Sequence, residues 1–198
     1  FMFTGIIQAI GKVKTKDDSE KGATLSFSTT DFDFSNVAIG DSIAVNGVCL
    51  TAVEIGSDYF KADLSQETLD CSIFASIKQG DSVNLEKALR LNQGIDGHMV
   101  SGHVDGIAQV VDKYDEGDST RFKISVPKSL VKYIARKGSV CINGVSLTVN
   151  DIDTDVFGIN IVPHTLVATT LGELNVGSKV NLEVDIIARH LEQLLKNN

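Results

Sequence analysis

Short stretches of β-forming residues, several with alternating polar and apolar positions, recur along the chain. Residues 42–45, 50–53 and 82–85 are of this kind, and their pattern predicts short strands. Asn46-Gly47 and Asn143-Gly144 fall between apolar runs, where Asn-Gly favours a tight hairpin turn because both residues tolerate positive φ. Short strands at regular spacing indicate a small closed barrel, in which every strand edge is paired.

The two halves of the chain repeat one another at a constant offset. Asn46-Gly47-Val48-Cys49-Leu50-Thr51 returns as Asn143-Gly144-Val145-Ser146-Leu147-Thr148, a shift of 143 − 46 = 97 positions. The same shift relates Gly80, Val83, Asn84, Leu85 and Glu86 to Gly177, Val180, Asn181, Leu182 and Glu183. Two copies are too few for a solenoid, which needs three or more repeats. We therefore predict an all-β chain with one barrel domain at 1–96 (the N-barrel), a second at 97–185 (the C-barrel) and a helical tail at 186–198.

Three segments carry helical signals. Residues 129–137 begin with a Ser cap and lead into Lys137-Gly138, a pattern typical of a short helix, and 65–77 is predicted to include another. In 186–196 the apolar residues recur at helical spacing with charges between them. A helix that follows a finished barrel must bury its apolar stripe against its own chain or against copies of itself. We favour an oligomer, because neither repeat contains an equivalent helix.

The composition excludes several classes of function. The 198 residues include 18 Lys and Arg against 26 Asp and Glu, a net charge of −8, so nucleic acid is not expected as a partner. No apolar run approaches the roughly 18 residues that a membrane-spanning helix needs. Cys49, Cys71 and Cys141 cannot all pair and show no metal-ligand spacing, and the first residues lack a signal-peptide pattern. We therefore expect a reducing, cytoplasmic setting.

Two kinds of site, a phosphate-binding loop and a zinc-binding helix, can be considered for the segment Gly97-His98-Met99-Val100-Ser101-Gly102-His103. The segment fits neither of them. Its glycines are spaced as in a phosphate-binding loop, but the Lys-Ser/Thr pair of such a loop is missing. His98 and His103 are five positions apart rather than four, with no carboxylate between them. A zinc-binding helix is therefore not predicted, and we expect no metal site here.

The two copies differ at polar positions beside their best-matched segments. Cys49 corresponds to Ser146, and Glu67 corresponds to His164. Two interpretations stay open: neutral drift on the surfaces of two barrels, or two copies of one ligand bound in unlike sites with different tasks. Thiol, hydroxyl and imidazole are groups that such sites would use for hydrogen bonding or proton transfer.

A set of motifs follows one order along the chain. It comprises Met2-Phe3-Thr4-Gly5-Ile6-Ile7, the two Asn-Gly-Val segments at 46–51 and 143–148, the segment 97–106, Pro163-His164-Thr165-Leu166 and Thr169-Thr170-Leu171-Gly172. Together these motifs resemble riboflavin synthase of the alpha-chain type, in the family that also includes the lumazine proteins. The match runs from end to end, and several separate motifs in the right order make it specific.

The resemblance implies an architecture and an activity. Members of the family are homotrimers whose chains hold two similar six-stranded Greek-key barrels and a C-terminal trimerisation helix. They convert two molecules of 6,7-dimethyl-8-ribityllumazine into riboflavin and 5-amino-6-(D-ribitylamino)uracil by transfer of a four-carbon unit, without a metal or organic cofactor. Each barrel binds one lumazine, and the active site forms where the N-barrel of one chain faces the C-barrel of a neighbour. Association with lumazine synthase, which supplies the substrate, stays open.

Carried over position by position, the resemblance predicts two pockets and six catalytic residues. The N-barrel pocket comprises Gly5, Ile6, Ile7, Cys49, Leu50, Thr51, Asp63, Leu64, Ser65, Gln66, Glu67 and Thr68. The C-barrel pocket comprises Gly102, His103, Val104, Ser146, Leu147, Thr148, Asn160, Ile161, Val162, Pro163, His164 and Thr165. Lys137 is expected to reach the ligand across the chain interface. The expected catalytic residues are Phe3, Cys49, His103, Ser146, Thr148 and Asp185.

The implied chemistry assigns a role to several of these residues. The C7 methyl group of the lumazine is acidic because its carbanion delocalises into the pteridine ring. We expect His103, with Ser146 and Thr148, to manage proton transfer and stabilise that anion in one barrel. Cys49 is expected to act at the other lumazine, by adding to C7 or by positioning a nucleophile that does so.

Other roles and another function stay open. Cys49 can serve as a small buried residue, Asp185 as a cap of the tail helix and Phe3 as barrel packing. Phe1 precedes the usual Met-Phe start of the family and is expected to crowd a site near it, and His164 stands where some members carry Glu. The rival function is that of a lumazine protein, which binds one ligand as an optical antenna without turnover. An acidic interaction module that binds no lumazine is a third.

Overall fold

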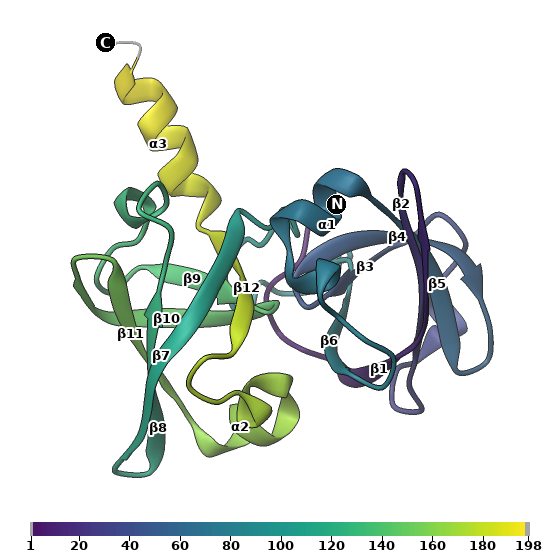
Figure 1. Cartoon of the computed structure of the whole chain (residues 1–198), viewed down its shortest axis with the longest axis horizontal. Helices are drawn as coiled ribbons and strands as arrows, with labels where there is room; N and C mark the ends of the chain where they lie inside the picture. The colour runs from purple at the N-terminus through teal and green to yellow at the C-terminus, as the bar shows by residue number, and fades with distance from the viewer. Residues whose placement is uncertain (1, 197–198) are drawn as a thin grey trace.

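The computed structural model describes residues 2–196 and shows two closed barrels side by side, followed by a helix (Figure 1). The N-barrel consists of β1 (Ala9–Ser19), β2 (Gly22–Ser28), β3 (Ser42–Val45), β4 (Val48–Ile55), β5 (Tyr59–Ser65) and β6 (Ser82–Lys87). The C-barrel consists of β7 (Gly106–Glu116), β8 (Ser119–Ser125), β9 (Ser139–Ile142), β10 (Val145–Asp153), β11 (Val156–Ile161) and β12 (Lys179–Val184). The expectation about Phe1 lies outside the described residues.

The two barrels share one topology. Their strands are antiparallel and follow the ring orders β1-β2-β5-β4-β3-β6 and β7-β8-β11-β10-β9-β12. In both rings the second strand pairs with the fifth rather than the third, a skipped connection of the Greek-key type. The prediction of an all-β chain with two similar six-stranded barrels is confirmed.

Short helical segments connect the strands, and α3 follows the last strand. They are α1 (Gln66–Cys71), α2 (Pro163–Ala168), α3 (Ile186–Lys196), and the 3₁₀ turns η1 (Phe34–Asn36), η2 (Ile73–Ala75), η3 (Val131–Tyr133) and η4 (Thr170–Glu173). The helix predicted within 65–77 is confirmed as α1, which Ser65 caps by accepting a hydrogen bond from Thr68 N at 3.2 Å. The predicted tail helix is confirmed as α3 over 186–196, and positions 197 and 198 of that prediction lie outside the described residues.

The helix predicted at 129–137 is wrong. In its place the chain makes the single turn η3 and then becomes extended at Ile134, where ψ is 122°. Leu130 and Ile134, on either side of this turn, are both buried in the C-barrel core. The segment therefore closes the end of the barrel between β8 and β9, and burying both side chains outweighs the local helical signal.

The hairpin turns predicted at the two Asn-Gly pairs are confirmed. Asn46 and Gly47 have φ of 45° and 79°, and Asn143 and Gly144 have φ of 46° and 83°. Positive φ at both central residues is the geometry that matches the twist of a two-residue hairpin. Each turn places its following strand, β4 or β10, with alternate side chains directed into the core and out toward the surface.

A buried asparagine network joins the two barrels. Asn84 Nδ2 donates to the Asn143 carbonyl oxygen at 2.8 Å, and Asn181 Nδ2 donates to the Asn46 carbonyl oxygen at 2.9 Å. The backbone N–H groups of Asn84 and Asn181 donate to Asn46 Oδ1 and Asn143 Oδ1, both at 2.8 Å. Every contact is thus repeated 97 positions along the chain. Because all four side chains are almost completely buried, the network holds the barrels in one pseudo-two-fold arrangement.

Helix α3 projects away from the C-barrel (Figure 1). It is tied to the barrel on one side, where Glu192 binds Lys132 and Tyr133 and Arg189 pairs with Asp105. Its apolar residues stay largely exposed: Ile187, Leu191, Leu194 and Leu195. In the described part of the chain no helix is long and apolar enough to cross a membrane.

Candidate active site

Each half of the chain sends the segment before its first strand onto the barrel of the other half. Phe3 and Val100 pair as an antiparallel bridge, with Phe3 N donating to Val100 O at 2.7 Å and Val100 N to Phe3 O at 3.0 Å. Beyond this crossing, Ile7 packs on the C-barrel core and Val104 packs on the N-barrel core. We call residues 3–7 and 100–104 the exchanged segments.

A cavity of about 260 Å³ lies beside β4 and α1 of the N-barrel. Cys49 N donates to the Gly102 carbonyl oxygen at 2.8 Å, which fixes one exchanged segment along its rim. Gly102 has φ of 78°, and a Cβ there would lie 2.6 Å from the Cys49 Cβ, so this close approach requires glycine. The cavity is lined by Val48, Cys49, Glu67, Thr68, Cys71, Ser72, Gly102, His103 and Val104.

The C-barrel repeats this arrangement with different side chains. Ser146 N donates to the Gly5 carbonyl oxygen at 2.8 Å. Gly5 has φ of 77°, and a Cβ there would lie 2.6 Å from the Ser146 Cβ. Exposed Ile6 follows Gly5, as exposed His103 follows Gly102. The scaffold of the two sites is therefore the same, while the Cys49 thiol and the His103 imidazole have the Ser146 hydroxyl and the aliphatic side chain of Ile6 at the equivalent positions.

The predicted grouping of the pocket residues is wrong in one respect. The prediction groups Gly5, Ile6 and Ile7 with Cys49, and it groups Gly102, His103 and Val104 with Ser146. The structure brings together the opposite pairs, because the exchanged segments cross at the Phe3–Val100 bridge before they reach a barrel. His103 therefore shares a cavity with Cys49 rather than with Ser146.

A buried glutamate holds each exchanged segment. Glu183, on β12, accepts hydrogen bonds from Ser101 N at 2.6 Å, Ser101 Oγ at 2.7 Å and Gly102 N at 2.9 Å. Glu86, on β6, accepts them from Thr4 N at 2.7 Å, Thr4 Oγ1 at 3.0 Å and Gly5 N at 3.1 Å. Burial raises the pKa of both carboxyl groups, and these hydrogen bonds oppose that rise. Glu86 and Glu183 occupy equivalent positions in the two copies of the repeat, but the repeat alone does not indicate that they contact a ligand site.

Ser146 has a partner that the sequence patterns missed. Its Oγ lies 2.7 Å from His98 Nδ1. Burial lowers the pKa of His98, and the Asp185 carboxylate opposes that lowering. A neutral imidazole at this distance can accept the hydroxyl hydrogen of Ser146 and so make the oxygen a better base. The two residues are 48 positions apart, a separation that carries no sequence signal.

Asp185 sits at the start of α3. Its Oδ1 accepts a hydrogen bond from Ile187 N at 2.9 Å, so the capping role left open by the sequence is confirmed. The same carboxylate also acts electrostatically on His98. The Asp185 side chain thus links the start of α3 to the Ser146–His98 pair.

Other predicted pocket residues divide between core and surface. Cys49 is half-buried, and Thr51 and Thr148 are exposed on the outer faces of β4 and β10. Thr24 Oγ1 donates to Asp63 at 2.6 Å, and Arg121 Nη1 donates to Asn160 at 2.8 Å. At the starts of α1 and α2 the exposed residues are Ser65, Gln66, Val162, Pro163 and His164. Thr165 on α2 and Leu147 on β10 are half-buried. The side chains of Leu50, Leu64 and Ile161 point inward and are buried in the barrel cores, so these positions offer a ligand their backbone groups, and their place in the pockets stays a prediction.

Two further predicted residues have unusual surroundings. Phe3 is fully buried between the barrels, where it packs with Ala44, Val100 and Cys141. Its side chain therefore has a packing role beneath the exchanged segments. Lys137 is exposed and has φ of 67°, a left-handed conformation that is strained for a non-glycine residue. Its counterpart 97 positions earlier is Gly40, which also has positive φ. Backbone strain of this kind is common at functional positions.

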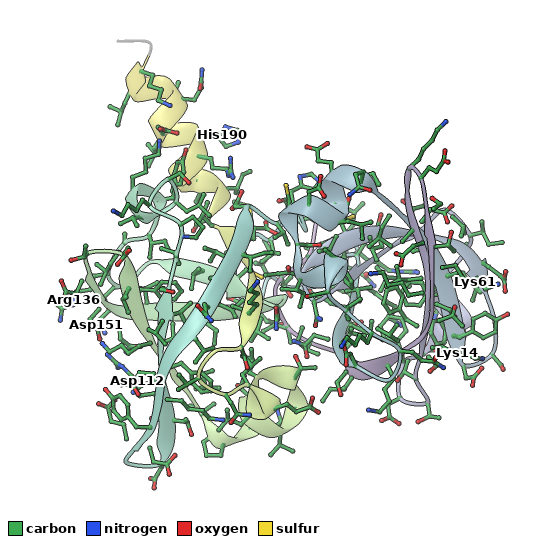
Figure 2. The ribbon with its side chains drawn as sticks, in the orientation of Figure 1. Lys14, Lys61, Asp112, Arg136, Asp151 and His190 are labelled. Carbon is green, nitrogen blue, oxygen red and sulfur yellow. The ribbon has the colours of Figure 1, made fainter. Side chains whose placement is uncertain are left out.

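Charged side chains labelled in Figure 2 lie on the outer sides of the barrels. Lys14 and Lys61 lie on the side of the N-barrel that faces away from the C-barrel, and Arg136 and Asp151 lie on the opposite outer side (Figure 2). Lys61 pairs with Glu54 at 2.8 Å, and Asp151 pairs with Arg121 and Lys123. These ion pairs are remote from the exchanged segments, where the polar groups are thiol, hydroxyl, imidazole and buried carboxylate.

Comparison with known proteins agrees with this geometry. The sequence profile described as "Lumazine binding domain" matches residues 4–88 and again 101–185. Riboflavin synthase from Photobacterium phosphoreum is 45% identical over 98% of this chain and 89% of that protein. Riboflavin synthase from Brucella abortus (strain 2308) is 42% identical over 98% of both. The chain belongs to the riboflavin synthase family.

Solved structures with a similar fold include complexes of the protein LumP. LumP complexed with riboflavin has a TM-score of 0.85 and 28% sequence identity, covering 92% of this chain and 98% of that one. LumP complexed with 6,7-dimethyl-8-(1'-D-ribityl) lumazine has a TM-score of 0.83 and 27% identity, with the same coverage. In this member of the riboflavin synthase family, each of the two profile matches covers one barrel and residues 4–7 or 101–104 of the exchanged segment that precedes it in the chain.

Proposed function

We propose that this chain is a riboflavin synthase, which converts two molecules of 6,7-dimethyl-8-ribityllumazine into riboflavin and 5-amino-6-(D-ribitylamino)uracil. The observation that carries the proposal is the pair of equivalent but unlike sites, Cys49 with His103 and Ser146 with His98. In a reaction between two identical lumazine molecules, one must donate the four-carbon unit and the other must accept it. Two sites of one scaffold with different polar groups meet that need, and relatives named riboflavin synthase share 35% to 45% identity.

The residues at the Ser146 site suit the first proton transfer. Burial lowers the pKa of His98 and so favours its neutral form, which can polarise the Ser146 hydroxyl. This pair is assigned to move the proton of the acidic C7 methyl group. Thr148, exposed two residues along β10, offers a second hydroxyl to the heteroatoms of the ring. Together they stabilise the carbanion without a metal or organic cofactor.

The residues at the Cys49 site suit the electrophilic partner. The Cys49 thiol is assigned to add to C7 of the second lumazine or to orient a nucleophile that does so. His103 lines the same cavity and is assigned to transfer the associated proton, a change from its expected place beside Ser146. Lys137 is assigned to contact ligand held by a neighbouring chain. Holding the two rings in one orientation supplies an entropic advantage that can reach several kcal/mol, roughly 7 or more in well-oriented systems.

Assembly into a homotrimer brings the two kinds of site together. In one chain the polar residues of each site lie near the barrel surface, so a second barrel is needed to enclose two stacked ligands. We assign this role to a neighbouring chain, held by the apolar face of α3 with Leu191 and Leu195. A cytoplasmic location and association with lumazine synthase are parts of the same proposal.

The experiment is incubation of the purified chain with 6,7-dimethyl-8-ribityllumazine alone. The expected result is growth of the riboflavin absorbance band, with one riboflavin formed for every two lumazines consumed. A stable complex with one lumazine per chain and no riboflavin would instead identify an antenna protein. Absence of lumazine binding would leave an interaction module, and either result would reject the synthase.

A further inference from the structure

We propose that Glu86 and Glu183 are positioning residues that act crosswise, each organising the ligand site of the opposite barrel. Glu183 stands in the C-barrel and would control the site at Cys49, while Glu86 stands in the N-barrel and would control the site at Ser146. The identity of the ligand rests on the proposed function. The crosswise assignment rests on the hydrogen bonds of the exchanged segments.

The path from Glu183 to the Cys49 cavity is short and continuous. Its two carboxylate oxygens accept three hydrogen bonds from Ser101 and Gly102, at 2.6 to 2.9 Å. The carbonyl oxygen of the same Gly102 accepts the hydrogen bond of Cys49 N at 2.8 Å, and the next residue is His103. Both Cys49 and His103 line the cavity. The carboxylate therefore determines where the backbone turns before His103 and where the imidazole enters the site.

Glu86 makes the equivalent path to the other site. It accepts three hydrogen bonds from Thr4 and Gly5, at 2.7 to 3.1 Å. The Gly5 carbonyl oxygen accepts the hydrogen bond of Ser146 N at 2.8 Å. The Thr4 carbonyl oxygen also accepts the hydrogen bond of His98 N at 3.1 Å, so this turn contacts both members of the Ser146–His98 pair.

A carboxylate is suited to this task in a way that an amide is not. Glu86 and Glu183 are 3% and 4% exposed, and such burial of an acid is unfavourable unless its oxygens are well satisfied. Each ionised group offers acceptor sites on both oxygens, and the three donors come from two consecutive residues. A glutamine of the same shape has one acceptor oxygen, and its NH₂ group would face a backbone N–H donor. The turn would then lose its fixed position while the barrel around it keeps its packing.

The test uses Glu183→Gln and Glu86→Gln in the full-length chain, with each variant serving as the control for the other. Occupancy of the Cys49 cavity is read from protection of Cys49 and Cys71 against iodoacetamide by 6,7-dimethyl-8-ribityllumazine, measured by peptide mass spectrometry. Both thiols line that cavity, and Cys71 is exposed at its rim. Total binding is read from a fluorescence titration with the same lumazine.

We expect the two variants to lose opposite sites. Glu183→Gln should need about tenfold more lumazine to protect the two thiols, while the second site in the titration keeps its affinity. Glu86→Gln should leave thiol protection unchanged and weaken the other site by about tenfold. Riboflavin formation should fall in both variants, because the reaction needs both sites.

Two results would overturn the crosswise assignment. One is that each variant weakens the site of its own barrel; the other is that both variants weaken both sites equally, as a general loss of stability would. If either glutamine variant does not fold, Ser101→Ala and Thr4→Ala remove one donor from each carboxylate and carry the same expectations at smaller amplitude. If lumazine fails to protect the thiols of the unaltered chain, the proposed function fails at this site; protection there with equal losses in the variants rejects the crosswise roles alone.

Discussion

Replacement of Asn84 by alanine tests whether the asparagine network holds the two barrels together. The Asn84 side chain donates to the Asn143 carbonyl oxygen and accepts from Thr170 N, both at 2.8 Å, and the residue is 1% exposed. Alanine would leave one buried C=O and one buried N–H unsatisfied. Each orphaned group costs about 1–3 kcal/mol, so the free energy of unfolding should fall by about 2–6 kcal/mol. That is a large part of the 5–15 kcal/mol that is typical of a folded domain.

The assay is urea unfolding followed by circular dichroism and by fluorescence of the tyrosines. Asn181→Ala is the symmetric test, because Asn181 bonds the Asn46 carbonyl oxygen and Ile73 N at 2.9 and 2.8 Å. The matched control is Asn92→Ala, an exposed position in the connection between the barrels, where a change within about 0.5 kcal/mol is expected.

The result also distinguishes docking from folding of each barrel. If the network chiefly docks the barrels, the variants should unfold in two separated transitions, since each barrel keeps its own core. A loss of under about 1 kcal/mol with a single unchanged transition would refute the reasoning, because the orphaned groups would then have found other partners.

Three further predictions concern the site and the assembly. His98→Gln should slow riboflavin formation. It should also remove a rise in thermal stability with pH below about 6.5, because the pKa of His98 is lowered in the folded chain and the unfolded chain therefore binds more protons in that window. Calorimetry of the variant and the parent between about pH 5 and pH 7.5 measures this difference. Lys137→Gly should relieve the positive φ and raise stability by at most about 1 kcal/mol, yet lower turnover; unchanged turnover would remove Lys137 from the site. Leu191→Glu should convert a trimer into monomers in light scattering, whereas a parent chain that is already monomeric contradicts the proposed assembly.

The repeat predicts the barrels well because it reports local structure. Asn46-Gly47 and Asn143-Gly144 require a particular turn, and alternation along the following strand requires one buried face, so both features are written in neighbouring residues. The exchange of segments between the barrels, by contrast, is not determined by neighbouring residues. A shift of 97 aligns Gly5 with Gly102 whether each segment packs on its own barrel or on the other, so the repeat is silent on the choice.

The composition of the site was predicted less completely than its scaffold, for related reasons. Cys49 and Ser146 stood out because the two copies differ there, whereas Glu86 and Glu183 are identical in both copies and therefore looked like scaffold. The spacing of His98 fits neither a metal site nor a phosphate loop, and its partner Ser146 is brought close by the fold rather than by spacing in the sequence. The helix predicted at 129–137 does not form, because a capping signal contributes less free energy than the burial of the Leu130 and Ile134 side chains in the core.

The exchanged segments also suggest how a chain of this kind arose. A single half carrying only its own Gly5 segment has no Gly102 segment to complete the cavity at Cys49, so it would need a second copy to supply one. Two identical halves related by a two-fold axis satisfy each other in this way, as a closed dimer does. Joining them through residues 88–96 makes the pairing intramolecular and independent of protein concentration. In a fused chain a change in one half need not be copied in the other, so Cys49 and Ser146 can differ at equivalent positions.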